Sequence, residues 1–205
     1  MSDQYHLAEL KIAMDSTHPS RAMPTAVPRD GKVLDIGCGA GQTLIASLYD
    51  GISFGVDIDF DALKLGRSMT DRVRFVCGAA ERLPYRDDAF DCVIARVSLP
   101  YTNIRASTGE ISRVLKKGGS LWMTLHPFSK CWQQARKTNY KGWIFFGCII
   151  LNSLLFHWVQ RQVRFFRRCE TFQTTRGMLF VLKRNGFDQV CVDRSKQFVV
   201  TARKR

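Results

Sequence analysis

The stretch Val33-Leu-Asp-Ile-Gly-Cys-Gly-Ala-Gly41 decides the fold of this chain. A short β-rich run over residues 32–36 leads directly into glycines at positions 37, 39 and 41. Glycines let the backbone turn tightly and approach a ligand closely, as in the first strand–turn–helix unit of nucleotide-binding folds. The spacing is GxGxG rather than the GxGxxG of dinucleotide-binding folds, and by itself it indicates no more than a tight turn.

An acidic residue after the next apolar run adds a second, independent signal. Asp57 ends the run 53–57 and stands 20 residues after Gly37. An acid at this place can accept hydrogen bonds from both hydroxyls of a ribose. The glycines and the acid, in this order, predict a nucleoside-binding site.

The pattern around this unit predicts the rest of the fold. Strand-like runs and helical stretches alternate, which is typical of βαβ units with a parallel sheet. The expected strands are 32–36, 53–57, 73–77, 90–95, 120–125, 190–192 and 198–201. The expected helices are 42–49, 61–69, 107–115 (with Gly118-Gly119 as the end signal) and 174–185. We predict an α/β fold with a Rossmann-like, mostly parallel seven-stranded sheet, an antiparallel C-terminal hairpin and helices on both faces.

Length and composition favour a single globular domain. The chain has 205 residues, of which 45% are hydrophobic and 24% charged, and a domain of this size can bury a substantial core. We divide it into an N-terminal cap (1–30), a binding half (31–126), an insertion (127–172) and a closing helix and hairpin (173–205). Residues 1–11 lack an apolar leader, and none of the seven cysteines forms a CxxC pair. We therefore expect reduced thiols and a cytoplasmic location.

The net excess of positive charge lies entirely in the C-terminal third. The formal net charge is +13, yet residues 1–129 contain 15 basic and 15 acidic residues. Residues 130–205 contain 16 basic residues against three acidic ones. This asymmetry predicts an anionic partner for that region, either a membrane surface, a nucleic acid or an acidic substrate.

Five motifs in order resemble those of a known family. They are VLDIGCGAG (33–41), GVDID (55–59), GAAERLP (78–84), FDCVI (90–94) and EISRVLKKGG (110–119). Together they look like the motifs of class I methyltransferases that use S-adenosylmethionine (SAM). The closest resemblance is to the small-molecule type, which includes the ubiquinone- and menaquinone-biosynthesis enzymes. The match covers residues 31–126, with a continuation through 173–204.

The resemblance implies SAM as the cofactor and a set of binding residues. It implies that Gly37, Gly39 and Gly41 line the methionine and ribose, and that Asp57 binds the ribose hydroxyls. It implies that Asp35 helps to hold the methionyl amino group, which the backbone near Arg96 also meets. On the adenine, it implies that Ile58 packs on the ring and that Ala80 and Glu81 border its edge. One position departs from the family, because Ala79 stands where an aspartate often accepts the adenine amino group. A backbone carbonyl or Glu81 would have to substitute there.

Methyl transfer from a sulfonium places modest demands on catalytic side chains. Orienting the acceptor, the methyl group and the sulfur in line supplies much of the rate, and a base helps if the acceptor is a phenol, alcohol or amine. His126 and Tyr101 follow two expected strands and are the candidate catalytic residues, with wall packing as the alternative for Tyr101. The histidines, cysteines and carboxylates show no metal-ligand spacing, so we expect no metal requirement.

The insertion contains the most apolar stretch of the chain. Residues 142–160 carry no charge and are flanked by Lys141 and Arg161. If the helix continues, Ser153, His157, Arg161, Arg164 and Arg168 fall on one stripe. A basic stripe beside aromatic surface is typical of a helix in a membrane interface, so residues 142–168 predict contact with an anionic membrane. The alternative is a lid helix, which would still favour a small, hydrophobic acceptor.

Other functions stay open at this point. An RNA methyltransferase fits the basic C-terminal third, although no separate RNA-binding module is visible. A SAM-binding protein without turnover fits the Ala79 departure. A nicotinamide oxidoreductase fits least, because of the GxGxG spacing.

Overall fold

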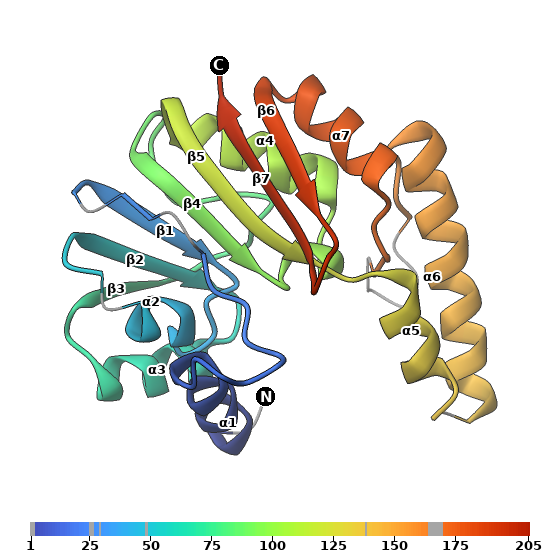
Figure 1. Ribbon diagram of the computed structural model, residues 1–205, viewed down its shortest axis with the longest axis horizontal. Coiled ribbons are helices and arrows are strands. Elements are labelled where there is room, and N and C mark those ends of the chain that lie inside the picture. Colours follow the sequence, from blue (N-terminus) through green and yellow to red (C-terminus); the bar gives the residue numbers. More distant parts are fainter. Residues whose placement is uncertain (1–2, 25–26, 29, 48, 138, 164–169) are drawn as a thin grey trace.

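A seven-stranded sheet forms the centre of the computed structural model, which describes residues 3–24, 27–28, 30–47, 49–137, 139–163 and 170–205. The strand order is β3-β2-β1-β4-β5-β7-β6 (Figure 1). The strands are β1 (Lys32–Ile36), β2 (Ile52–Asp57), β3 (Val73–Cys77), β4 (Phe90–Arg96), β5 (Leu115–Leu125), β6 (Phe187–Asp193) and β7 (Phe198–Lys204). Strands β1 to β5 pair in parallel, and β7 is antiparallel to both β5 and β6. The predicted sheet and its closing hairpin are confirmed.

Helices cover both faces of the sheet, as predicted. They are α1 (Asp3–Met14), α2 (Gln42–Ala46), α3 (Phe60–Met69), α4 (Ile104–Val114), α5 (Phe128–Ala135), α6 (Tyr140–Val159) and α7 (Thr175–Arg184), with a short 3-10 turn at η1 (Leu99–Tyr101). Strand alternation divides the core between the faces. Cys92 of β4 joins the core cluster of Leu44 and Leu63, from α2 and α3, whereas Val93 joins the cluster that contains residues of α4 and α7.

The junction between α4 and β5 differs from the prediction. The helix ends at Val114, one residue before the expected end at 115, and the chain enters β5 at once, so the Gly118-Gly119 pair lies inside the strand and does not end the helix. Gly118 has a φ of 73°, and the register between β4 and β5 shifts within this stretch. The glycines therefore serve an irregularity inside the strand, because a backbone in the left-handed region favours glycine there as much as at a helix end.

A half-buried arginine fixes the loop after β3 to α4. Arg113 donates to the Glu110 carboxylate at 2.8 Å and to the Tyr85 and Leu83 carbonyls at 2.7 and 3.1 Å. Glu110 also accepts a hydrogen bond from the Leu83 amide at 2.7 Å. The EISR part of the fifth motif is thus a clamp, and it fixes the loop that carries residues 78–84.

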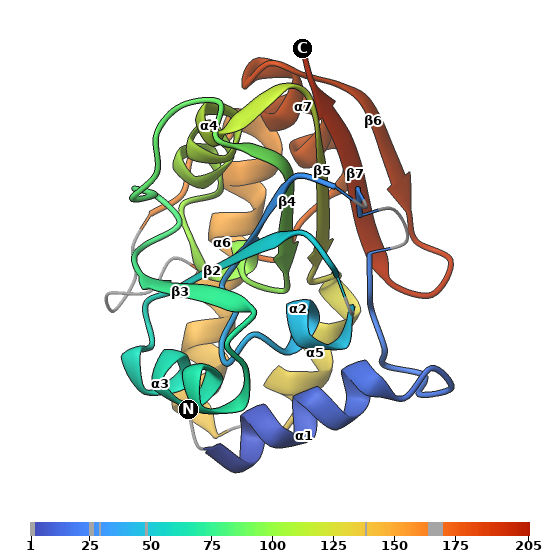
Figure 2. The ribbon, with the colours of Figure 1, turned by 90° about the vertical axis from the view of Figure 1, so that its left-hand side faces the viewer.

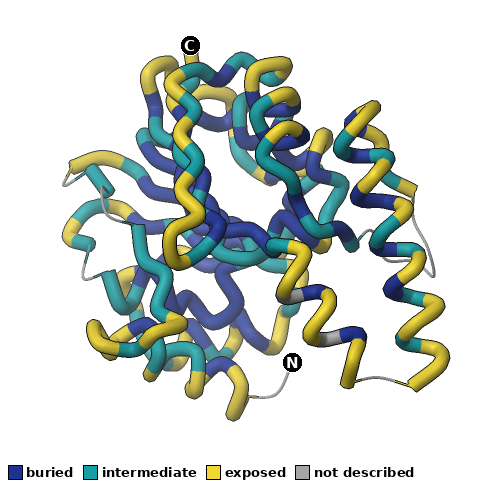
Figure 3. Tube along the Cα trace, turned by 45° about the vertical axis from the view of Figure 1, so that its right-hand side comes forward, coloured by how far each residue is buried: buried dark blue, intermediate teal, exposed yellow. Residues whose placement is uncertain are grey.

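The insertion forms two helices, and its second helix is shorter than the basic stripe requires. Helix α6 ends at Val159 because Gln160 adopts a φ of 50° and closes the last turn. Arg161 therefore lies beyond the helix, and Arg164 and Arg168 lie outside the described residues. Ser153 is buried, so the predicted continuous basic face, with Ser153 extending it, is wrong. Figure 3 shows buried and exposed residues alternating along α6. Figure 1 shows α6 standing beside α5, at the edge of the molecule away from β1 to β3.

Candidate active site

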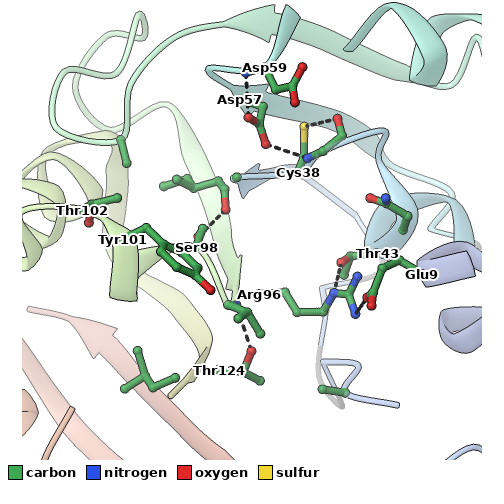
Figure 4. A pocket seen from close by; sticks show the side chains of 18 of the residues that line it. Glu9, Cys38, Thr43, Asp57, Asp59, Arg96, Ser98, Tyr101, Thr102 and Thr124 are labelled. Carbon is green, nitrogen blue, oxygen red and sulfur yellow. Dashed lines mark hydrogen bonds and ion pairs between the residues drawn. The ribbon is translucent and has the colours of Figure 1, made fainter. Parts of the chain in front are cut away.

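A cavity of about 1220 Å³ opens at the carboxyl ends of the parallel strands. Open α/β sheets bind their ligands at this end, in the crevice where the strand order reverses. Residues of the loop after β1, the ends of β2, β4 and β5, and helices α1 and α5 line it. Figure 4 shows the part of the cavity around Asp57, Arg96 and Tyr101. Typical small-molecule pockets measure roughly 300–1,000 Å³, so this one has room for a cofactor together with an acceptor.

The glycine loop forms one wall of the cavity. Gly37 and Gly39 line it, with φ values of 69° and 55°. A Cβ atom on Gly37 would overlap the side chain of Ser98, so only glycine fits. Gly41 has a different task from the one expected. It begins α2 with a φ of 82°, and a Cβ there would meet the Phe75 ring at 2.8 Å instead of a ligand.

Asp57 lines the cavity with an oriented carboxylate. Its Oδ2 accepts a hydrogen bond from the Gly39 amide at 2.8 Å, and its Oδ1 accepts one from the Asp59 amide at 2.9 Å (Figure 4). Each carboxylate oxygen can accept a further hydrogen bond. The arrangement suits a ligand that presents two neighbouring hydroxyls, as a ribose does.

Asp35 lies directly behind the glycine loop rather than in the cavity wall. It is 1% exposed, and neither carboxylate oxygen has a hydrogen-bond partner among the described residues. Burial raises the pKa of Asp35 to about 7, which the Arg96 charge and the Thr43 hydroxyl oppose and the Asp57 charge reinforces. A buried carboxyl without partners is costly, and a cationic ligand above the loop would relieve that cost.

The residues expected to contact the adenine all line the cavity. Ile58, Ala79, Ala80 and Glu81 all line it, and Ile58 is 75% exposed, so its side chain is available to pack on a flat ring. Glu81 Oε1 accepts a hydrogen bond from the Asn103 amide at 2.9 Å. Part of the hydrogen-bonding capacity of Glu81 is therefore already used, which limits how far it can replace the family's aspartate.

Arg96 contributes its side chain as well as its backbone. The guanidinium forms an ion pair with Glu9 at 3.2 Å, and its Nε donates to Thr43 Oγ1 at 3.1 Å. This connects β4 to α1 and α2 across the cavity (Figure 4). The next residue, Val97, has a φ of 59°, a costly conformation for a β-branched residue, and its amide donates to Thr124 Oγ1 at 3.0 Å.

Helix α1 contributes residues that sequence reasoning missed. It packs beside α2 and α3 at the end of the sheet where the cavity opens (Figure 2). His6 is 1% exposed and lines the cavity above Gly39, and its Nδ1 lies 2.9 Å from Gln42 Nε2. Tyr5 and Glu9 line the same side. No motif in residues 3–14 predicts that this helix lines the cavity, because its position depends on contacts with the loop after β1.

The two candidate catalytic residues have different surroundings. Tyr101 lines the cavity, and burial, with Glu170 nearby, raises its pKa to about 12, so its hydroxyl stays protonated at neutral pH. His126 is 4% exposed and is not among the residues that line the cavity. Its ring packs edge-on against Tyr101, 5.4 Å between centroids, and its amide donates to Gln173 at 3.0 Å. His6, unlike His126, lines the cavity.

Comparison with known proteins identifies the domain. Residues 34–123 match the family described as "Methyltransferase domain". An uncharacterized methyltransferase, YcgJ of Bacillus subtilis, is 36% identical over 102 residues, which cover 46% of this chain and 40% of the relative. Demethylmenaquinone methyltransferase of Roseiflexus castenholzii is 30% identical over 135 residues, 61% of this chain and 53% of the relative.

The fold is also that of solved methyltransferases. The structure of geranyl diphosphate C-methyltransferase from Streptomyces coelicolor, in complex with Mg²⁺, geranyl diphosphate and S-adenosyl-L-homocysteine, superposes with a TM-score of 0.59 at 16% identity. The superposition covers 98% of this chain and 80% of the other. The chain spans about half the length, or less, of the curated relatives described above. Residues 34–123 therefore carry the match to the methyltransferase domain, and the seven-stranded sheet built around them has the fold of solved SAM-dependent methyltransferases.

Proposed function

We propose that this chain transfers a methyl group from SAM to a small, hydrophobic acceptor. The observation that carries the proposal is the joint position of the Gly37–Gly39 turn and Asp57, which line one end of a cavity large enough for a second molecule. The unpartnered Asp35 carboxyl behind that turn fits a cationic ligand better than a phosphate-bearing one. When bound, SAM supplies an activated methyl group on a positively charged sulfur.

The residues around the cavity hold and orient the reactants. Asp57 offers acceptors to ribose hydroxyls, Ile58 and Ala80 offer apolar surface to adenine, and Gly37 and Gly39 let the backbone approach the ligand closely. Positioning of this kind contributes roughly 7–11 kcal/mol to a displacement reaction. The protonated Tyr101 hydroxyl acts as a hydrogen-bond donor toward the acceptor side, rather than as a base.

Two observations support a hydrophobic acceptor. The far side of the cavity includes the apolar residues Leu125, Pro127 and Phe198, beside the polar Gln133 and Gln197. This lining suits a molecule with an apolar body and a few polar groups. The relatives named for demethylmenaquinone and geranyl diphosphate act on molecules of that kind, and we extend this substrate class to the present chain.

The cofactor half of the proposal is tested by calorimetry with SAM and with S-adenosylhomocysteine. We expect both to bind and NAD not to bind. Asp57→Ala should weaken SAM binding about 10- to 100-fold, because the loss of one buried hydrogen-bonding group costs roughly 1–3 kcal/mol. Unchanged SAM affinity in this variant would remove Asp57 from the site.

The acceptor half is tested by a methyl-transfer assay with labelled SAM. The assay offers quinols, isoprenoids, RNA and protein in parallel, and a quinol or isoprenoid should be labelled. Label in RNA alone would favour the RNA methyltransferase, and SAM binding without transfer to any acceptor would favour a SAM-binding protein. EDTA should leave the rate unchanged, since we expect no metal requirement.

A further inference from the structure

Helix α6 buries Asn152 and Ser153 together with Phe146, Ile149 and Phe156, and its outward face is apolar as well. Its exposed stripe repeats at helical spacing and carries no charge: Tyr140, Ile144, Gly147, Leu151, Leu154 and Trp158. Tyr140 is 69% exposed, Ile144 57% and Trp158 63%. A helix on the surface of a protein in water normally turns polar or charged residues outward, and this stripe has none.

The inward face is bound to the chain by polar contacts. Asn152 Nδ2 donates to the Val163 carbonyl at 2.8 Å, and Asn152 Oδ1 accepts from the Val163 amide at 2.7 Å. Ser153 Oγ accepts from the Phe172 amide at 3.0 Å, and His157 Nδ1 lies 2.8 Å from Thr174 Oγ1. These contacts fix the rotation of α6 about its axis, and this rotation turns the apolar stripe outward.

From this arrangement we propose that the outward face of α6 inserts into the interface of an anionic membrane, with the helix axis parallel to the surface. The inference concerns where the protein acts, goes beyond the proposed methyl transfer and does not depend on it. The expected cytoplasmic location would then include a peripheral attachment to the membrane.

The charges around α6 favour lipid over a second copy of the chain. Residues 130–205 contain 16 basic and three acidic residues, so two such surfaces would repel each other. Exposed basic residues stand at both ends of the stripe, with Lys137 and Lys141 at the first and Arg161 and Arg176 at the second. The Arg176 guanidinium lies 4.7 Å from the Trp158 ring centroid. Anionic headgroups complement this charge, and each basic group close to them contributes about 1 kcal/mol.

Aromatic residues also mark both ends of the helix. Trp143 is 43% exposed near the first end, in edge-on contact with Trp132 of α5 at 5.7 Å between centroids. Trp158 occupies the other end. Tryptophan and tyrosine concentrate at the headgroup level of membranes, where an apolar ring and a polar N–H or O–H are both accommodated.

The inward contacts favour an in-plane helix over a spanning one. Helix α6 is long and apolar enough to cross a membrane by length and composition, and 28% of its most apolar window is buried. Crossing would pull Asn152 and Ser153 away from Val163 and Phe172, and each polar group left without a partner in hydrocarbon costs several kcal/mol. Half-immersion keeps these bonds and covers the apolar stripe.

Helix α5 connects this face to the cavity. Its residues Ser129 and Gln133 line the cavity, whereas Phe128 and Trp132 pack toward α6, each with its ring about 6 Å from that of Phe146. Helices α6 and α5 therefore separate a membrane on the outward face of α6 from the acceptor space. A hydrophobic acceptor dissolved in the bilayer would have a short path to it.

The test is flotation of the purified full chain with phosphatidylcholine vesicles, with and without phosphatidylglycerol. Leu151→Ser/Leu154→Ser removes two half-exposed side chains from the stripe. The matched control, Met14→Ser/Ile52→Ser, removes two exposed apolar side chains from other surfaces. We expect the wild type and the control to float with anionic vesicles, and the stripe variant to bind at least tenfold more weakly. Lys137→Gln/Lys141→Gln should lower binding several-fold at low salt and little at high salt.

Three results would overturn the proposal. The first is a wild type that stays out of both vesicle fractions. The second is a stripe variant that floats as well as the control, which would leave charge alone as the cause. The third is a wild-type dimer in solution that the stripe variant converts to a monomer without any vesicle binding, which would make a second copy the occupant of the face. Equal thermal unfolding of the stripe and control variants shows that loss of binding is not loss of fold.

Discussion

The cofactor half and the insertion use apolar and glycine residues for opposite purposes. In residues 31–126, a Cβ on Gly37 would overlap a neighbouring side chain, and the surrounding charge sums to nearly zero. In α6, a Cβ atom added to Gly147 would have nothing within 4 Å, and Ile144 and Leu151 on the same stripe are exposed. Contacts within the chain explain the pattern of the first region, whereas the exposed apolar stripe of the second is the surface that we propose contacts a membrane.

The largest expected difference between the two regions is the effect of replacing a glycine on stability. Gly37→Ala should destabilise the fold by about 3 kcal/mol or more and abolish SAM binding, because its Cβ meets Ser98 in a left-handed backbone. Gly147→Ala should stabilise by up to about 1 kcal/mol, because alanine is the better helix former and the space is open. Urea unfolding measures both, and equal effects in the two variants would remove the distinction.

The next largest effect concerns the arginine clamp. Arg113→Gln leaves the Glu110 carboxylate and two backbone carbonyls without their partner, so we expect a loss of about 2–3 kcal/mol in the free energy of unfolding. Arg161→Gln changes an exposed arginine of the insertion and should stay within about 0.5 kcal/mol. Chemical denaturation of both variants compares the free energy of unfolding after the same arginine-to-glutamine substitution in each region. A clamp variant as stable as Arg161→Gln would contradict the assigned role.

A pH-dependent effect should belong to the cofactor half alone. Below a pH of about 7 the buried Asp35 carboxyl is protonated in the free protein. A cationic cofactor favours the ionised form, so binding at low pH must first release a proton. SAM affinity should therefore rise about tenfold between pH 5.5 and 7.5 and then level off. In Asp35→Asn, calorimetry should show weaker binding with little of this rise, and a rise as steep as that of the wild type would exclude Asp35 as its cause.

Asp35 also has a consequence for stability, and its sign follows from the raised pKa. The unfolded carboxyl ionises near pH 4, whereas the folded one stays protonated until about pH 7. Between these values the folded state holds the extra proton, so the contribution of Asp35 to the free energy of unfolding falls as pH rises. Asp35→Asn should lack this decline. Urea unfolding of both proteins across pH 4.5–7.5 provides the check without any cofactor.

The smallest expected effect is a gain in SAM affinity from a substitution at Ala79. Ala79 lines the cavity where the family often has aspartate, and Glu81 is partly occupied by Asn103. Ala79→Asp should tighten SAM binding about two- to fivefold, the scale of one added hydrogen bond. Ala106→Asp, on the exposed side of α4, is the matched control and should leave SAM affinity unchanged. Tighter binding in both variants would indicate a general effect of charge.

Local signals predicted the sheet and several of the residues that line the cavity. The GxGxG turn and Asp57 are each defined by residues close in sequence to a strand end, so their positions follow once the strands pair. His6 could not be predicted, because its burial depends on Gln42, 36 residues away. His126 illustrates the same limit, since its place after β5 was foreseeable but the Gln173 contact that accompanies its burial was not.

The end of α6 shows a second kind of limit. Helical spacing suggested a basic stripe continuing to Arg168, and nothing in residues 153–168 alone forbids it. The helix stops because Gln160 turns into the left-handed region and Val163 folds back to pair with Asn152. Periodicity describes which residues would share a face, but tertiary contacts decide where a helix ends.

The ion pair between Glu9 and Arg96 has a consequence for timing. Helix α1 covers the cavity through this pair and through His6 with Gln42. Both contacts join residues of the first 14 to the loop or strand ends beneath. We expect a molecule held under α1 to exchange with solvent faster when these contacts open. The residence time of a spent cofactor is thus tied to the strength of one partly screened charge pair, and salt should shorten it.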